Sequence, residues 1–153
     1  MIWGAIAYNW KGPLIIIPKN HRKGEDYVKD ILGGPLWDAY QQLSEERGFL
    51  KVMEDSAPVH TCKAANDFMI SHGMESLPHP AQSPDMNPIK HVWGILKRRV
   101  NARGEISENE EELGRVLLEE WDKIELWNIN SLINSMPNRV RELTGSQGMS
   151  TRF

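Results

Sequence analysis

The sequence predicts an α/β fold in which short strands alternate with helices before a helical C-terminal region. Two runs rich in β-branched and aromatic residues, 2–8 and 13–18, are typical of strands. Apolar residues at helical spacing follow from residue 24, and the last third of the chain carries only helical patterns. At 153 residues with 40% hydrophobic content, the chain is long enough for one domain with a buried core.

The composition excludes several classes of protein. The net charge of −3 argues against a uniformly basic nucleic-acid binder, so any affinity for DNA must come from a local patch. The single cysteine, Cys62, cannot form an internal disulfide and fits a reducing compartment. No apolar run approaches membrane-spanning length, and the N-terminus lacks the pattern of a signal peptide. We therefore expect an intracellular protein that is neither secreted nor membrane-bound.

The N-terminal part is expected to open with a hairpin. Its strands, Ile2–Tyr8 and Pro13–Pro18, are joined through residues 9–12, where Asn and Gly tolerate the positive φ values of a turn. From Gly24 to Leu43 the apolar residues have helical spacing, which the sequence Gly33-Gly34-Pro35 interrupts. We expect two helical pieces there, because glycine and proline break or kink a helix.

A further strand is expected at Phe49–Asp55, before a helix at Thr61–His72. Side chains alternate along a strand, so Glu54 and Asp55 should point to opposite sides of it. Met74–Leu77 is a candidate for another short strand.

The next helix carries the most informative pattern in the chain. Asn87 and Pro88 are typical of a helix start, because Asn caps the first turn and Pro needs no hydrogen-bond partner there. The apolar residues that follow share one face: Ile89, Val92, Trp93, Leu96 and Val100. Basic and polar residues gather beside that face: Lys90, Lys97, Arg98 and Asn101. We predict a helix that packs against a core and carries a basic stripe.

Helices also account for the C-terminal third. The spacing of apolar residues predicts a helix over Asn109–Lys123 and a second one that includes Ile129 and is halted near Pro137. Val140 and Leu143 allow a last short helix.

Two motifs carry a family resemblance. The sequences S-P-D-M-N-P-I at residues 83–89, W-G-I-L-K-R-R-V at 93–100 and E-D-S-A-P-V-H-T at 54–61 resemble catalytic motifs of the Tc/mariner superfamily of DDE transposases. The spacing agrees as well, because 34 residues separate Asp55 from Lys90, as between the second and third catalytic acids of that family. The resemblance spans nearly the whole chain and implies a ribonuclease H-like (RNase H-like) fold.

The resemblance also implies an activity. Members of this family cleave DNA and transfer strands during transposition and integration, so the implied partner is DNA, in particular transposon ends. The implied cofactor is Mg²⁺ or Mn²⁺, held between acidic side chains. A homodimer or a complex with a related transposase chain and a nuclear location are implied in the same way.

The resemblance assigns Asp55 to the second acidic position and Lys90 to the third. A lysine ammonium group has no lone pair to give to a metal ion and repels it. We therefore expect Asp55 to be a vestigial metal ligand that holds no ion and forms an ion pair with Lys90. The substitution favours a catalytically inactive chain, although the class of enzyme implied is a transposase and endonuclease.

The same segments provide candidate DNA-binding residues: His60, Lys97, Arg98, Arg99 and Arg103. Each has a plainer interpretation. His60 is equally consistent with a hydrogen-bonded structural role, and the basic run with a solvated helix face. Zinc binding by Cys62 and His60 has no second cysteine to support it.

We divide the chain into a partial RNase H-like DDE transposase domain, residues 1–104, and a helical C-terminal extension of the same domain, residues 105–153. In the family, a central strand with the first catalytic Asp precedes the segment that begins here at Ile2. We therefore expect an RNase H-like fold that lacks its first central strand and is marginally stable alone. Alternatively, Met1 is an internal residue of a longer reading frame.

Two functions from different classes remain. The first is DNA cleavage and strand transfer by the catalytic domain of a mariner-like transposase. The second is a non-catalytic, transposase-derived fragment that binds DNA or another protein chain. Lys90 favours loss of catalysis, because removing a ligand from a cooperative metal site abolishes the positioning of the ion.

Overall fold

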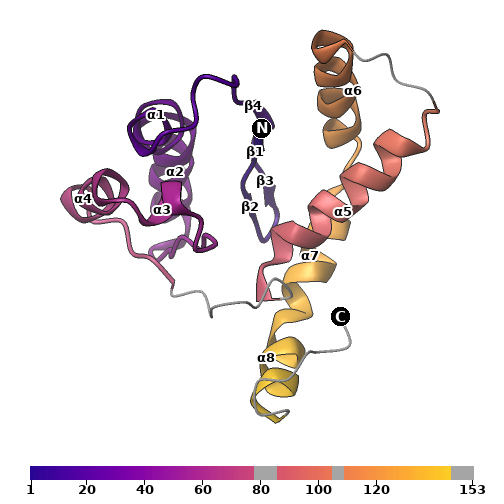
Figure 1. Ribbon diagram of the computed structural model, residues 1–153. Helices are drawn as coiled ribbons and strands as arrows, with labels where there is room; N and C mark the ends of the chain where they lie inside the picture. Colours follow the sequence, from indigo (N-terminus) through magenta and orange to yellow (C-terminus); the bar gives the residue numbers. More distant parts are fainter. Residues whose placement is uncertain (78–85, 105–108, 146–153) are drawn as a thin grey trace. The chain divides into compact units, whose positions relative to one another are not determined.

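The computed structural model describes residues 1–77, 86–104 and 109–145, with side chains as far as residue 142. The chain forms two compact units, whose elements are drawn in Figure 1. Unit 1 comprises Met1–Trp3 and Ile17–Ser83, and unit 2 comprises Gly4–Ile16 and Pro84–Phe153. These units do not follow the division expected at residue 104, and the expected domain assignment stays a prediction.

Unit 1 is built mainly from one long helical segment with a kink. It comprises α1 (Gly24–Tyr27), the π-helical segment η1 (Val28–Leu36) and α2 (Trp37–Arg47). The backbone of Gly34 leaves the helical region, with φ −133° and ψ −112°. The predicted pair of helical pieces is therefore confirmed, because the glycine permits a kink that a side chain would resist. Buried apolar residues line the inner face of this segment: Tyr27, Ile31, Leu32, Leu36, Ala39 and Leu43.

The second half of unit 1 holds two shorter helices, α3 (Pro58–Thr61) and α4 (Lys63–Ser71). The predicted single helix at Thr61–His72 is therefore correct for its main part and wrong at its start. Cys62 separates the two helices with extended backbone angles, φ −65° and ψ 158°. Proline at the start of α3 begins a separate turn, because its fixed φ suits the first helical position.

The predicted strand at Phe49–Asp55 is wrong over most of its length. Only Val52 forms a bridge, parallel to Ser76, in the part of the chain that the structure describes. The Val52 amide donates to the carbonyl of Glu75 at 2.8 Å, and the Leu77 amide donates to the carbonyl of Val52 at 2.7 Å. A strand needs a neighbour along its whole length, and strand propensity alone does not supply one. The short strand predicted at 74–77 is likewise reduced to this one bridge, at Ser76.

The N-terminal residues form four strands of two residues each: β1 (Ile2–Trp3), β2 (Ile6–Ala7), β3 (Trp10–Lys11) and β4 (Ile15–Ile16). In unit 2, β2 and β3 are antiparallel, with Ile6 opposite Lys11 and Ala7 opposite Trp10.

The observed hairpin turn is earlier and shorter than predicted. It consists of Tyr8 and Asn9, and Asn9 takes the positive φ of 55°. Asn adopts this left-handed conformation more readily than most residues, which explains why the turn falls there. Trp10 and Lys11, predicted to lie in the turn, belong to the second strand.

The helix α5 (Pro88–Asn101) of unit 2 confirms the predicted helix start and apolar face. The side-chain oxygen of Asn87 accepts a hydrogen bond from the Ile89 amide at 3.3 Å. Val92 and Leu96, at 0% and 1% exposed, lie in the core of unit 2. The spacing of the apolar residues along α5 thus sets which side of the helix is buried.

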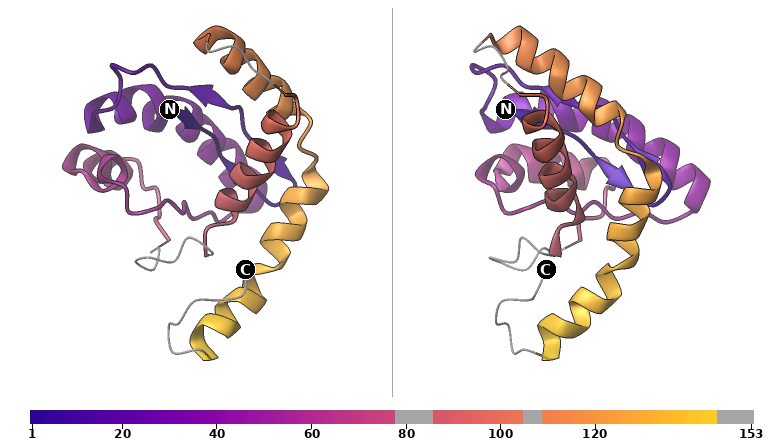
Figure 2. Two further views of the ribbon diagram at one scale, coloured as in Figure 1. Left: turned by 45° about the vertical axis from the view of Figure 1, so that its right-hand side comes forward. Right: turned by 90° about the vertical axis from the view of Figure 1, so that its right-hand side faces the viewer.

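The remaining helices of unit 2 are α6 (Glu110–Asp122), α7 (Leu126–Asn134) and α8 (Met136–Gly145). Figure 2 shows α8 continuing roughly along the course of α7. The helix predicted to halt near Pro137 ends at Asn134, and Pro137 is the second residue of the next helix, α8. None of the described helices has the length and apolar character needed to cross a membrane.

Trp121 lies at the centre of the unit 2 core and is 1% exposed. Its indole N–H donates to the carbonyl of Gly12 at 2.9 Å, and its ring stacks on Trp93 with centroids 5.2 Å apart. Gly4 packs against both rings, since a Cβ added there would lie 2.9 Å from Trp93. The N-terminal hairpin segment is therefore part of the core that holds α5 and α6.

Candidate active site and nucleic-acid interface

The second acidic position, Asp55, lies in unit 1 just before α3. Its Oδ1 is 2.9 Å from Nδ1 of His60 and accepts a hydrogen bond from the Ala57 amide at 3.3 Å. Helix α3 brings His60 back over the aspartate, because Pro58 starts a helical turn immediately after the carboxylate. The structure therefore brings together two residues that the sequence proposed for separate roles, Asp55 as a metal ligand and His60 as a DNA contact.

Glu54 lies beside the same imidazole. Its Oε1 accepts a hydrogen bond from the hydroxyl of Tyr27 and lies 4.0 Å from Nε2 of His60. Although Glu54 and Asp55 were expected to point to opposite sides of a strand, one imidazole ring approaches both carboxylates. Alternation applies to a strand, and this segment is not one.

Burial has the largest effect on the pKa values of Glu54 and Tyr27. It raises the pKa of Glu54, and the neighbouring charge of Asp55 adds to that rise, whereas the hydrogen bond from Tyr27 and the His60 ring oppose it. Burial and the Glu54 carboxylate also raise the pKa of the Tyr27 hydroxyl. The tyrosine therefore keeps its proton at neutral pH and acts as a hydrogen-bond donor. Its ring also contacts His60, with centroids 4.9 Å apart.

These residues do not form a site for a divalent cation by themselves. No group of three or more His, Cys, Asp or Glu side chains among residues 1–77, 86–104 and 109–142 could hold a metal ion. Mg²⁺ and Mn²⁺ prefer several hard oxygen ligands. Oxygens of Asp55 and Glu54 are already engaged with His60 and Tyr27, so the donor set of unit 1 does not fit such an ion.

The third acidic position, Lys90, lies in the first turn of α5, in unit 2. Its side chain is exposed, and its amide donates to the carbonyl of the capping residue Asn87 at 3.0 Å. Asp55 and Lys90 belong to different units, so their expected ion pair stays a prediction.

A buried arginine that sequence reasoning did not single out contacts the residue after Lys90. Arg139 is 3% exposed, and its Nη1 lies 3.0 Å from Nε2 of His91. Its Nε donates to the hydroxyl of Ser135 at 2.9 Å. Arginine side chains are mostly exposed in folded proteins, so the sequence around Arg139 would predict a surface position and gives no sign of its burial.

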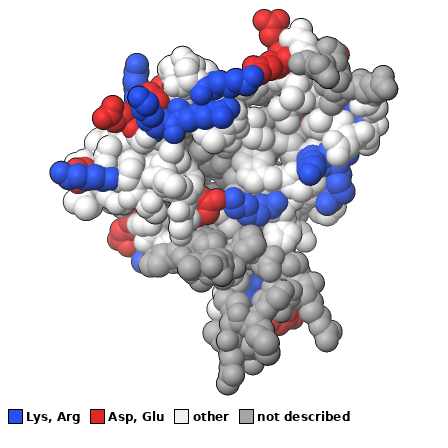
Figure 3. Space-filling model, viewed as in Figure 1, with Lys and Arg blue, Asp and Glu red and all other residues white. Residues whose placement is uncertain are grey.

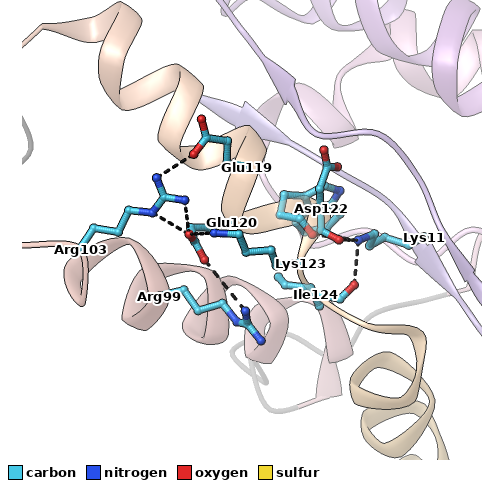
Figure 4. Close-up of polar contacts among 9 residues, drawn as sticks. Lys11, Arg99, Arg103, Glu119, Glu120, Asp122, Lys123 and Ile124 are labelled. Atoms are coloured by element: carbon cyan, nitrogen blue, oxygen red, sulfur yellow. Dashed lines mark hydrogen bonds and ion pairs between the residues drawn. The ribbon is translucent and has the colours of Figure 1, made fainter.

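The predicted basic residues of α5 fall into two groups. Lys97 and Arg98 are exposed, and Figure 3 shows basic side chains over this helix. Arg99 and Arg103 instead face carboxylates of α6, as Figure 4 shows. The guanidinium of Arg103 donates at 2.7 Å both to Glu119 and to Glu120.

Sequence reasoning missed the two glutamates of this network. Hydrogen bonds from Arg103 and Arg115 hold the pKa of Glu119 below its ordinary value, and those from Lys123 and Arg103 do the same for Glu120. The spacings of Arg115 with Glu119 (i,i+4) and of Glu120 with Lys123 (i,i+3) were local signals for two of the pairs. The ion pairs between α5 and α6 join residues far apart in the sequence and left no such signal.

Solved structures with the same architecture define the fold. The catalytic domain of the Mos1 transposase with raltegravir and Mg superposes with a TM-score of 0.78 at 21% identity, covering 93% of this chain and 72% of that one. The Mos1 strand transfer complex gives a TM-score of 0.71 at 20% identity, covering 93% of this chain and 41% of that one. The chain therefore has an RNase H-like fold, as predicted.

Sequence comparison defines the family. Residues 37–113, just over half of the chain, match the model of the DDE superfamily endonuclease family, and the chain belongs to that family. It is 29% identical to the Tc3 transposase of Caenorhabditis elegans, over 97% of this chain and 44% of the relative. It is 31% identical to the Tcb2 transposase of Caenorhabditis briggsae, over 100% of this chain and 54% of the relative. The chain thus spans about half the length of these curated relatives, and the predicted resemblance to Tc/mariner transposases is confirmed.

Proposed function

We propose that this chain is a transposase-derived DDE domain that binds DNA but has lost metal-dependent DNA cleavage. The observation that carries the proposal is Lys90, a cation at the position where the family motif has its third acidic residue. The family match includes both Asp55 and Lys90, so the substitution falls well inside the matched part of the domain and not at its edge.

The loss of cleavage follows from the chemistry of the site. Two-metal cleavage of a phosphodiester needs ions fixed between carboxylates that activate the attacking oxygen and stabilise the leaving one. An ammonium group at position 90 offers no ligand and repels such ions. Mos1 catalytic domains solved with Mg and with Mn support divalent ions as the cofactor of active members of the fold. In this chain, the Asp55 carboxylate instead lies 2.9 Å from Nδ1 of His60.

DNA is the proposed partner because an exposed basic surface remains on α5. Lys97 and Arg98 are exposed, and their charges suit the phosphates of a DNA backbone. Mos1 has been solved as a paired-end complex with a transposon end, which supports DNA as the partner of this fold. A second copy or a related transposase chain as a protein partner, and a nuclear location, belong to the same proposal.

Nicking of supercoiled DNA in the presence of Mn²⁺ tests the loss of cleavage. The chain is compared with its Asp55→Ala variant, and an active Tc/mariner transposase serves as the positive control. We expect both forms of this chain to give the same background. Nicking by the unmodified chain that disappears in the Asp55→Ala variant would overturn the proposed inactivity.

Fluorescence anisotropy with a short labelled duplex at several salt concentrations tests DNA binding. We expect binding that weakens with salt. A Lys97→Gln/Arg98→Gln variant should reduce the slope of log affinity against log salt by about one for each phosphate that it no longer neutralises. Arg115→Gln is a matched control, because it removes an exposed positive charge from α6, where Arg115 pairs with Glu119. Absence of salt-dependent binding would contradict the proposed DNA-binding role.

A further inference from the structure

A cluster of cations surrounds one buried carboxylate between α5 and α6 of unit 2. Glu120 is 5% exposed, and its Oε1 accepts hydrogen bonds from Nε of Arg103 and from Nζ of Lys123, both at 2.7 Å. Nη1 of Arg99 lies 4.0 Å from the other carboxylate oxygen, Oε2. Figure 4 shows Arg99 reaching this carboxylate from α5, Arg103 from just after the end of α5, and Lys123 from the end of α6.

The three cations differ in how many of their N–H donors already bond to a carboxylate. Arg103 directs Nε and Nη2 to Glu120 and Nη1 to Glu119, so its planar fork is fully engaged. Lys123 gives one of its three N–H donors to Glu120 and is 54% exposed. Arg99 is 38% exposed and lies beyond hydrogen-bond distance from Glu120. Lys123 and Arg99 therefore retain donors that face solvent.

Charge is also unbalanced. Three cations, Arg99, Arg103 and Lys123, approach the single carboxylate of Glu120. The neighbouring Glu119 does not restore neutrality, because it is shared between Arg103 and Arg115. Among the ion pairs of the described residues, cations therefore outnumber anions at Glu120, a buried anion that fixes where the cations lie.

We propose that Arg99 and Lys123 together hold one phosphate group of a DNA backbone, and that Glu120 is the residue that positions them. The inference rests on the proposed DNA-binding function and extends its surface from α5 to the end of α6. A phosphate offers several oxygen acceptors to the free donors of a guanidinium and an ammonium group. Nζ of Lys123 lies 2.7 Å from one oxygen of the Glu120 carboxylate and Nη1 of Arg99 lies 4.0 Å from the other, so both nitrogens flank the same group.

An ordinary surface ion pair predicts something different for Lys123. Pairs at i,i+3 on an exposed helix contribute little, and a lysine near the end of a helix also interacts with the helix dipole. In that case the loss of Lys123 would leave DNA affinity unchanged. Phosphate binding predicts weaker binding and a smaller dependence on salt.

Glu120 separates the two interpretations more sharply. Removing a negative charge near DNA should by itself strengthen binding, because the repulsion of the polyanion falls. If Glu120 positions Arg99 and Lys123, its loss should weaken binding instead. Glu111→Gln is a matched control, since it removes an exposed carboxylate from the first turn of the same helix.

The experiment measures binding of a short duplex by anisotropy across a salt series, using the whole chain. We expect Lys123→Gln and Arg99→Gln each to weaken binding by about fivefold at 0.1 M salt and to lower the salt slope by about one. The loss of binding free energy in the double variant should be smaller than the sum of the two single losses, since the two residues share one phosphate. Glu120→Gln should also weaken binding, whereas Glu111→Gln should not. Inorganic phosphate added at the same ionic strength should compete only weakly with the duplex.

The outcomes distinguish this inference from the proposed function. If the chain does not bind the duplex at all, both are overturned. If Lys97→Gln/Arg98→Gln weakens binding while Lys123→Gln leaves it unchanged, the phosphate site is wrong and the DNA-binding role stands. Because Lys123 is half exposed, its variant tests the site even if Glu120→Gln unfolds the chain.

Discussion

The ammonium group of Lys11 donates a hydrogen bond to the carbonyl oxygen of Ile124 at 2.7 Å. The same group donates to the carbonyls of Trp121 at 2.8 Å and Asp122 at 3.0 Å. The last carbonyls of a helix have no partner within it and carry the negative end of its dipole. One lysine from the N-terminal hairpin therefore caps the C-terminal end of α6, more than one hundred residues away in the sequence.

Replacing this lysine should destabilise unit 2. Lys11→Met removes three hydrogen bonds to carbonyls, of which the Trp121 carbonyl keeps a bond from the Ile124 amide, and we expect a loss of about 1–3 kcal/mol of unfolding free energy. Urea unfolding followed by the fluorescence of Trp121 and the other tryptophans measures it. Lys29→Met, an exposed lysine of unit 1, is the control and should be neutral. Equal stability of the two variants would rule out the capping role of Lys11.

The hydroxyl of Tyr27 makes a second long-range contact that can be tested. Tyr27→Phe leaves the buried Glu54 carboxylate without its hydroxyl donor, so we expect a loss of about 1–3 kcal/mol at neutral pH. Tyr40→Phe is the control, because the Tyr40 hydroxyl makes long contacts of 3.4 Å to the Leu50 and Gly73 carbonyls and to the Glu75 amide. Glu54→Gln combined with Tyr27→Phe should recover part of the loss, since it removes the buried charge. A Tyr27→Phe variant as stable as the Tyr40→Phe variant would contradict this account.

Local rules explain which parts of the fold the sequence could predict. Asn87 and Pro88 mark the start of α5 through contacts within one turn, and the spacing of Val92 and Leu96 sets its buried face. The kink at Gly34 is likewise a property of neighbouring residues. The prediction of a strand at 49–55 was wrong because a strand depends on distant partners that its own composition does not reveal.

In the candidate site, too, the sequence predicted what neighbouring residues determine and missed what distant contacts determine. Motif spacing pointed to Asp55, Lys90 and His60, but not to the contact that joins Asp55 to His60, because the turn formed by α3 was not predicted. The carboxylate of Glu120 was missed altogether, since its partner Arg103 lies 17 residues earlier in the sequence, just beyond the end of α5. Contacts of this kind depend on how two helices pack, and a sequence read in short windows does not contain them.

The single bridge at Val52 makes a specific prediction about backbone dynamics. The amides of Val52 and Leu77 donate hydrogen bonds across the bridge and should exchange slowly with deuterium. The amides of Lys51 and Met53 have no such bond among the described residues and should exchange quickly. Hydrogen exchange resolved by residue, for example by NMR, measures both. Uniform protection from 49 to 55 would mean that a complete strand forms there.

The carboxylates between α5 and α6 predict how stability depends on pH. Arg103 lowers the pKa of Glu119, and Lys123 together with Arg103 lowers that of Glu120, both from 4.5 in the unfolded chain. At and below that pH the unfolded state binds more protons than the folded state, so stability should fall as the pH drops through this range.

Replacing Glu120 should therefore flatten the acid side of the stability curve. Urea midpoints measured between pH 7 and pH 3 should decrease less for Glu120→Gln than for the unmodified chain, although its stability at pH 7 should be lower. Glu111→Gln, on the exposed first turn of α6, should keep the slope of the unmodified chain. If Glu120→Gln loses stability with acid as steeply as the unmodified chain, the ion pairs around Glu120 do not contribute to folding in solution, and Arg99 and Lys123 have no fixed anion to position them.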